Sequence, residues 1–177
     1  HPAIADQVEK TSDIIFVGQF SPLMGLETIQ RALSSPSLRK YKVTIIGSGQ
    51  TNENYLMANL PGNVTRINRV PYEELPTIIA RHRLSLGIFG DSEKAASVFP
   101  NKVIESLCVG VPCITRFGDI SEHFSDIGCL FIEPRDSTKL IDSIQLVMED
   151  ANLLEELSLE AKAFAEKFRK ETAQYCL

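Results

Sequence analysis

Short apolar runs alternate along the chain with longer stretches in which apolar residues recur every third or fourth position. The runs hold four to six residues and many β-branched side chains, which predicts strands at 14–17, 43–46, 64–68, 84–89, 112–115 and 129–132. The longer stretches predict helices at 26–33, 50–60, 72–82, 138–148 and 152–170, with one more opened by Pro100. Strands that alternate with helices of this length form βαβ units around a parallel sheet.

This alternation predicts an α/β fold, a Rossmann-like doubly wound parallel sheet of about six strands in a three-layer α/β/α arrangement. The 177 residues fit a single domain, residues 1–177, because a domain takes about 100–200 residues. Such sheets bind ligands beyond the carboxyl ends of their strands, close to helix N-termini. That rim would consist of the segments 18–25, 47–50, 68–71 and 90–102, all of which contain Gly, Pro or Asn.

The composition narrows the classes of partner. Hydrophobic residues make up 44% of the chain and the net charge is −5 with no basic stripe, so nucleic acid is not expected as a partner. The longest apolar runs fall short of the ~20 residues that span a bilayer. The cysteines lack metal-ligand spacing, which favours reduced thiols in a cytoplasmic protein and no metal site; they are Cys108, Cys113, Cys129 and Cys176. The chain begins with His1 and not with Met, as expected of a fragment.

The stretch 97–115 (SVFPNKVIESLCVGVPCIT) combines a short helix and a buried strand with charged residues that packing does not require. Pro100 at the first helical position would leave the backbone N–H groups of Asn101 and Lys102 pointing outward. Lys102 also places a positive charge at the helix end that disfavours one, and an anionic ligand would resolve this conflict. A surface ion pair between Lys102 and Glu105, three residues further on, explains the same pattern equally well.

Two further features of the rim carry candidate chemistry. Glu105 lies among apolar residues, so it must face solvent or a cleft or meet hydrogen-bond donors, for which ribose hydroxyls are suitable. The loop 18–25 has glycine at both ends, and it either binds an anion at the following helix N-terminus or forms a plain turn. His82 and His123 have no acid or nucleophile beside them, so both are expected at the surface or at a helix cap. No catalytic triad or Cys/His pair can be assembled from the sequence.

The segments FVGQFSPLMGLETI, TIIGSGQ, NVTRINRVPYEEL and PNKVIESLCVGVPCIT resemble, in this order, the C-terminal domain of glycosyltransferase family 4 (group 1) enzymes of the GT-B fold. GCLFIEPRDSTKLIDSIQLVMED is similar to the closing strand and helix of the same domain, so the resemblance spans 14–170. It implies a domain that holds a nucleotide-diphosphate sugar in a cleft against an N-terminal acceptor domain, which this chain lacks. It implies no cofactor besides this donor substrate, and peripheral membrane association through the missing domain is possible.

The resemblance also assigns residues. It matches Glu105 to the glutamate that binds the ribose hydroxyls and Val70 to the backbone beside the base. It places the start of the Pro100 helix against the diphosphate. The full set of implied nucleotide-sugar-binding residues is Gly18, Gln19, Val70, Phe99, Asn101, Lys102 and Glu105.

The sequence departs from the family pattern at the groups next to the transferred sugar. Ser97 stands where the first glutamate of the Glu-x7-Glu motif is found, eight positions before Glu105. Gln19 and Met24 stand where the family has the Arg and Lys that clamp the diphosphate. Lys102 restores one positive charge if it reaches the phosphates.

These departures leave the catalytic residues unassigned, although Asp91 or Glu93 could replace the missing acid. The leading hypothesis is the donor-binding half of a retaining glycosyltransferase in polysaccharide or glycoconjugate biosynthesis, inactive without its acceptor domain. The alternative is a non-catalytic, degenerate module that assembles with a partner. A different nucleotide-dependent GT-B enzyme, such as a sugar epimerase, is a third possibility.

Overall fold

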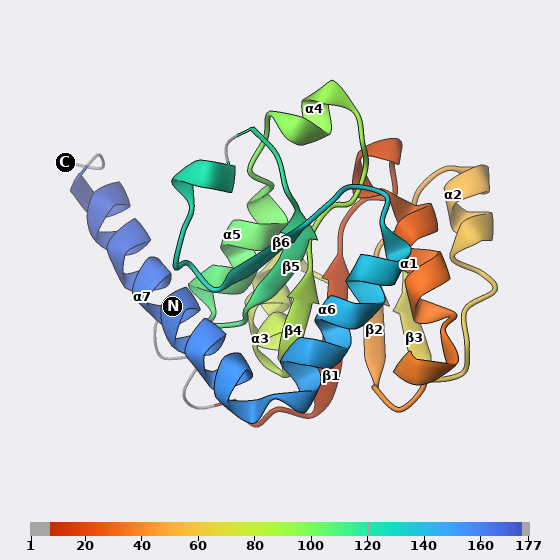
Figure 1. Ribbon diagram of the computed structural model, residues 1–177, viewed down its shortest axis with the longest axis horizontal. Coiled ribbons are helices and arrows are strands. Elements are labelled where there is room, and N and C mark those ends of the chain that lie inside the picture. The colour runs from red at the N-terminus through yellow and green to blue at the C-terminus, as the bar shows by residue number, and fades with distance from the viewer. Residues whose placement is uncertain (1–7, 120, 175–177) are drawn as a thin grey trace.

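The computed structural model describes residues 8–119 and 121–174, in which six parallel strands form one sheet (Figure 1). The order across the sheet is β3-β2-β1-β4-β5-β6. The strands are β1 (Ser12–Val17), β2 (Val43–Ile46), β3 (Val64–Ile67), β4 (His82–Leu86), β5 (Cys113–Arg116) and β6 (Cys129–Ile132). The chain turns back between β3 and β4, so β1 and β4 are neighbours at the point where the winding reverses. The predicted Rossmann-like α/β fold with six strands is confirmed.

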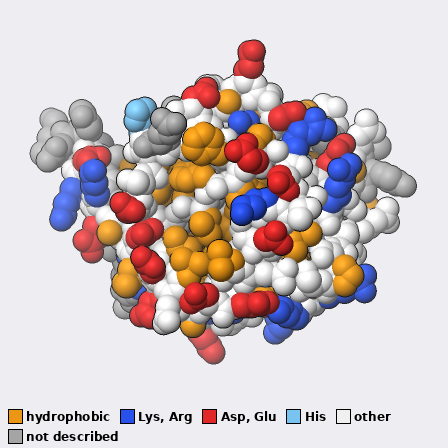
Figure 2. Space-filling model, viewed as in Figure 1, with side chains coloured by type: hydrophobic (Ala, Val, Ile, Leu, Met, Phe, Trp, Pro, Cys, Tyr) orange, Lys and Arg blue, Asp and Glu red, His pale blue; other side chains and the backbone are white. Residues whose placement is uncertain are grey.

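Helices cover both faces of the sheet. In Figure 1, α1 and α6 lie in front of the sheet and α3 and α5 behind it. The helices are α1 (Leu26–Leu33), α2 (Thr51–Leu56), α3 (Leu75–Ala80), α4 (Glu93–Ala96), α5 (Asn101–Cys108), α6 (Ser137–Glu149) and α7 (Ala151–Gln174). The 3-10 turns are η1 (Pro22–Met24), η2 (Pro36–Leu38), η3 (Tyr72–Glu74) and η4 (Ser121–His123). On the face drawn in Figure 2, acidic and basic side chains are interspersed around a group of hydrophobic ones.

The central strand β1 shows how the sequence pattern builds the two layers. Ile14 and Phe16 point to the side covered by α1 and α6, whereas Ile15 points to the side covered by α3. All three side chains are fully buried. Since burying one such side chain contributes about 1.5–3 kcal/mol, an uninterrupted apolar run is what a strand covered on both faces requires.

The predicted helix at 72–82 differs most from the structure. The expected single helix is divided into the 3-10 turn η3 and α3, and its last residue, His82, begins β4. Of the two positions expected for His82, the surface is wrong because the residue is only 4% exposed, whereas the cap fits a ring that contacts a carbonyl in the last turn of α3. Its Nδ1 lies 2.8 Å from the Ile78 carbonyl oxygen and its Nε2 lies 2.8 Å from Thr44 Oγ1. With both ring nitrogens partnered, the imidazole can be buried without an unsatisfied polar group.

Further expectations concern the cysteines, the chain start and the membrane. Cys108, Cys113 and Cys129 are free thiols, whereas Cys176 and the chain start at His1 lie outside the described residues. None of the helices in the described part of the chain combines the length and the apolarity that a bilayer span requires.

Candidate functional site

A cleft of about 1310 Å³ follows the carboxyl ends of β1, β2 and β3. Its walls come from three of the four predicted rim segments, and the residues that line it lie within 17–22, 46–50 and 68–75. Backbone hydrogen bonds continue the ladder into these loops, from Gly18 N to Ile46 O and from Gly47 N to Ile67 O, both at 2.9 Å. The floor of the cleft is therefore an extension of the sheet.

Gly25 brings the loop after β1 against the loop after β4. It has a φ of 64°, in the left-handed region that favours glycine, and a Cβ there would clash with the backbone of Phe89. The Gly90 N–H donates to Leu23 O at 3.2 Å across the same contact. Glycine at this end of the predicted loop is thus explained by backbone packing.

Three of the predicted site residues line the cleft: Gly18, Gln19 and Val70. Gln19 is exposed, and Val70 is half-buried in the segment that leads from β3 to η3. Their placement agrees with the predicted arrangement of the loop after β1 opposite the segment after β3.

Lys102, on the first turn of α5, reaches back under this rim. Its Nζ lies 4.0 Å from the centroid of the Phe16 ring and 2.8 Å from Met24 Sδ. The ammonium is directly behind Gly18, where any Cβ would clash with it. Burial lowers the pKa of Lys102 to about 7, because desolvation disfavours the charged form. Within residues 8–119 and 121–174 Lys102 forms no ion pair, so the surface pair with Glu105 weighed from the sequence is not formed.

Glu105, one turn further along α5, is half-buried and meets Tyr72 instead. The Tyr72 hydroxyl donates to Glu105 Oε1 at 3.3 Å. The negative charge of Glu105 raises the pKa of Tyr72, so the phenol stays protonated and remains a donor. The carboxylate thus has a hydroxyl partner at the end of the cleft that Tyr72 lines.

Phe99 and Asn101, like Lys102 and Glu105, are not among the residues that line the cleft. Asn101 is exposed at the start of α5. The Phe99 ring stacks on Phe124, with centroids 4.2 Å apart and an interplanar angle of 15°. This stacking belongs to a small apolar cluster with Val103 and Leu107. Contacts of Phe99 and Asn101 with a donor stay predictions.

The groups considered for the missing acid lie near α4. Ser97 is exposed at the C-terminal end of this helix, and Glu93 is exposed in its first turn. Asp91 pairs with Arg135, with Oδ2 and Nη1 2.9 Å apart. The hydrogen bond from Arg135 lowers the pKa of Asp91, which favours an ionised carboxylate and disfavours a proton donor.

Sequence reasoning missed two residues of the cleft. Arg69 and Tyr72 both line it and both are exposed, so they add a cation and an aromatic ring to its surface. Arg69 lies inside the predicted rim segment 68–71, and Tyr72 follows it directly. The signal that could have found Tyr72 is an aromatic residue in a turn opened by Pro71, where no packing pattern requires one.

Solved structures with the same fold come from glycosyltransferases. Sucrose-phosphate synthase from Thermosynechococcus elongatus superposes with a TM-score of 0.71 at 16% identity, over 98% of this chain and 48% of that one. The C-terminal domain of a group 1 family glycosyl transferase, LpcC, from Francisella tularensis gives 0.72 at 15% identity, over 92% and 88%. HepE from Anabaena, solved in complex with UDP and glucose, gives 0.68 at 17% identity, over 89% and 44%. This chain therefore spans less than half of the first and third of these proteins.

The family follows from the sequence comparison. A search of curated proteins found no match. The family model for "Glycosyl transferases group 1", in contrast, matches residues 2–164. Because this match covers most of the chain and agrees with the fold and with the predicted resemblance, the protein belongs to the group 1 glycosyl transferases.

Proposed function

We propose that this chain is the donor-binding half of a retaining glycosyltransferase and that its cleft binds a nucleotide-diphosphate sugar. The observation that carries the proposal is the position of Lys102, whose ammonium lies against Met24 Sδ and behind Gly18. Met24 stands where the resemblance expects a cationic clamp, so a cation from another element reaches the place of the missing one. A desolvated ammonium without a carboxylate is a suitable partner for a phosphate.

The remaining groups of the site fit the other parts of such a donor. Glu105 can accept hydrogen bonds from ribose hydroxyls in place of the Tyr72 phenol, and the backbone at Val70 is free to meet a base. Arg69 supplies a second cation at the cleft. A bound UDP and glucose in HepE, which shares the fold, support the choice of donor class. The proposal includes no metal and no cofactor besides the donor substrate.

The acceptor would be a glycan or glycolipid in polysaccharide or glycoconjugate biosynthesis. The proposal includes an N-terminal acceptor domain, because GT-B transfer takes place between two domains, and a cytoplasmic location with peripheral membrane association through that domain. This chain alone would bind donor without transferring sugar.

The second candidate is a non-catalytic module that assembles with a partner. It is favoured by Ser97, which is exposed near α4, and by Asp91, whose pKa is lowered by the hydrogen bond from Arg135 so that it is a poor proton donor. Gln19, an exposed neutral side chain at the cleft, points the same way. A module of this kind would keep the fold and lose the affinity for nucleotide.

Calorimetric titration of the chain with UDP-, GDP- and ADP-glucose separates the two. We expect one of the three to bind, and Glu105→Ala to weaken it by about 1.5–3 kcal/mol, the range for a hydrogen bond to a charged group. Glu149→Ala, which removes a carboxylate at the opposite end of the sheet, is the matched control and should leave the affinity unchanged. Binding of none of the three donors would favour the non-catalytic module, and unchanged affinity in Glu105→Ala would refute the assignment of Glu105.

A further inference from the structure

Tyr72 is the most exposed of the large hydrophobic side chains in the described part of the chain, at 72%. It belongs to η3, between the cleft and a second, smaller recess of about 130 Å³. Tyr72, Leu75 and Glu105 line this recess together with the apolar side chains of Pro76, Ile79, Cys108 and Val109. An aromatic ring so exposed is held by few contacts and can change its position at little cost.

The hydroxyl of this ring is engaged with Glu105, the carboxylate of the smaller recess. Its distance of 3.3 Å from Glu105 Oε1 exceeds the approximately 2.5–2.7 Å of a strong O–H···O⁻ hydrogen bond. The contact is therefore weak. A better-placed hydroxyl donor would replace it, and the ribose of a nucleotide presents two such hydroxyls side by side.

We propose that Tyr72 occupies Glu105 while the cleft is empty and yields it to ribose hydroxyls when a nucleotide binds. The inference rests on the proposed function. A ligand with both hydroxyls replaces the lost phenol bond with two new ones. A ligand without them leaves Tyr72 in place on Glu105. Tyr72 thus competes with the ribose for Glu105 and lowers the affinity for ribonucleotides by the free energy of one weak hydrogen bond.

The ring has a second role in the same exchange. Once the hydroxyl is released, the aromatic face stays at the junction of the cleft and the apolar recess, beside the carboxylate that holds the ribose. There it packs against the nucleoside, since an aromatic face stacks on any base. The hydroxyl and the ring of Tyr72 therefore act in opposite directions on affinity, and two variants separate them.

Tyr72→Phe removes only the competing hydroxyl. With the nucleoside diphosphate that binds best among UDP, GDP and ADP, we expect about two- to fivefold tighter binding, the gain from one weak hydrogen bond that need not be broken. With the 2′,3′-dideoxy form of the same nucleotide, Tyr72→Phe should have no effect on affinity. In a Glu105→Ala background the effect should vanish for both ligands.

Tyr72→Ala removes the ring as well, and we expect it to weaken both ligands at least about fivefold through the lost stacking. The melting temperature of both variants should stay that of the wild type, because Tyr72 is exposed. Calorimetry with the two ligands and five proteins (the wild type, the three single variants and the double variant Tyr72→Phe/Glu105→Ala) measures all of these effects. Equal weakening by Phe and Ala, or an equal effect of Tyr72→Phe on both ligands, would overturn the role of Tyr72 while the donor site stands. Failure of the wild type to bind any nucleotide would overturn the proposed function and this inference with it.

Discussion

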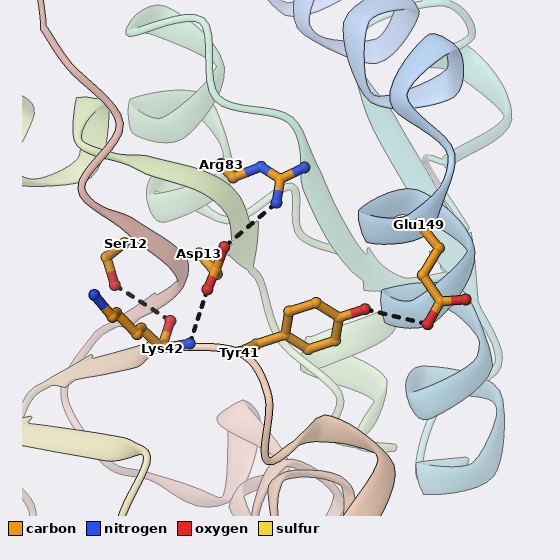
Figure 3. Close-up of polar contacts among 6 residues, drawn as sticks. All are labelled: Ser12, Asp13, Tyr41, Lys42, Arg83 and Glu149. Atoms are coloured by element: carbon orange, nitrogen blue, oxygen red, sulfur yellow. Dashed lines mark hydrogen bonds and ion pairs between the residues drawn. The ribbon is translucent and has the colours of Figure 1, made fainter.

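At the amino ends of the strands the carboxylate of Asp13 is shared between two donors, while at the carboxyl ends the ammonium of Lys102 has no carboxylate partner among the described residues. Asp13 accepts a hydrogen bond from the Lys42 backbone N–H at 2.9 Å and lies 3.4 Å from the Arg83 guanidinium (Figure 3). Nearby, the Tyr41 hydroxyl donates to Glu149 on α6. The two ends of one sheet thus use polar side chains in different ways.

This difference between the two ends of the sheet distinguishes polar groups that stabilise the fold from polar groups that are available to bind a ligand. Polar groups that are satisfied within the protein hold the fold together and have little left to offer a ligand. A desolvated cation without a carboxylate costs stability, and such a group is retained where a ligand can pair with it. Substitutions at the amino ends should therefore lower the free energy of unfolding without changing donor affinity, whereas substitutions of the binding groups at the carboxyl rim should weaken donor affinity without lowering the free energy of unfolding.

The largest effect is expected for Lys102→Met. Burial lowers the pKa of Lys102 from its ordinary 10.5 to about 7, so between these pH values the unfolded chain binds one more proton than the folded one. The stability of the wild type should therefore rise with pH over this window relative to the variant, by up to about 1.4 kcal/mol per pH unit. At pH 7 and below, where the full penalty applies, Lys102→Met should be the more stable protein and the weaker donor binder.

Urea unfolding of both proteins at several values between pH 6 and 10 measures this difference. Subtracting the variant removes the contribution of other groups that titrate in the same range. Parallel stability curves would mean that the ammonium is not desolvated in the folded protein.

Asp13→Ala is expected to have the next largest effect, and in the opposite sense. It leaves the Lys42 N–H and the Arg83 guanidinium without their acceptor, and the Arg83 side chain is partly buried. We expect a loss of about 1–3 kcal/mol in the free energy of unfolding with donor affinity unchanged. Asp13→Asn keeps an acceptor for the Lys42 N–H and should lose less. A change in affinity would break the proposed separation between the two ends of the sheet.

The sheet was well predicted from the sequence because a strand that is buried on both faces consists of an uninterrupted run of apolar residues. Where a buried apolar residue does not pair with a neighbouring strand, the same apolar run predicts a strand that is too long. The predicted strand 84–89 continues past the end of β4, since Phe89 N donates to Met24 O in the neighbouring loop and not to a strand. The hydrophobic side chain of Phe89 therefore indicates that the residue is buried, but its backbone hydrogen bond belongs to the loop contact and not to the sheet.

The site was predictable in its location but not in its pairings. Glu105 and Lys102 are three residues apart, and local spacing favours an ion pair between them. The structure directs Lys102 to Met24, 78 residues away in sequence, through the space that Gly18 leaves open. Glu105 meets Tyr72, 33 residues away. Partners this distant depend on how the loops are placed by the sheet, which no local pattern encodes.

His82 lies at the amino end of β4, and the pH dependence of the free energy of unfolding can test whether this residue stabilises the fold. Burial lowers its pKa below the ordinary 6.5, more than its hydrogen bond to Ile78 O raises it, while nearby Lys10 lowers it and Asp13 raises it. The unfolded chain then binds more protons in mildly acid solution, so the stability that neutral His82 contributes is present above pH 6.5 and is lost as the pH falls below it. The stability advantage of the wild type over His82→Gln should be constant above pH 7 and shrink in acid. An advantage that does not change with pH would show that the pKa of His82 is the same in the folded and the unfolded chain.

The smallest effect is expected for Arg135→Gly, at an exposed ion pair of the carboxyl rim. Arg135 has a φ of 60°, a conformation that costs an arginine energy and a glycine little, and its guanidinium pairs with Asp91. Glycine removes the pair but relieves the backbone, and exposed pairs are weak, so the two effects should nearly cancel. Arg135→Ala loses the pair and keeps the strain, so its melting temperature should fall below that of Arg135→Gly, and by less than that of Asp13→Ala. If Arg135→Gly were instead clearly less stable than the wild type, the pair with Asp91 could not be weak, and this part of the rim would belong with the stabilising end of the sheet.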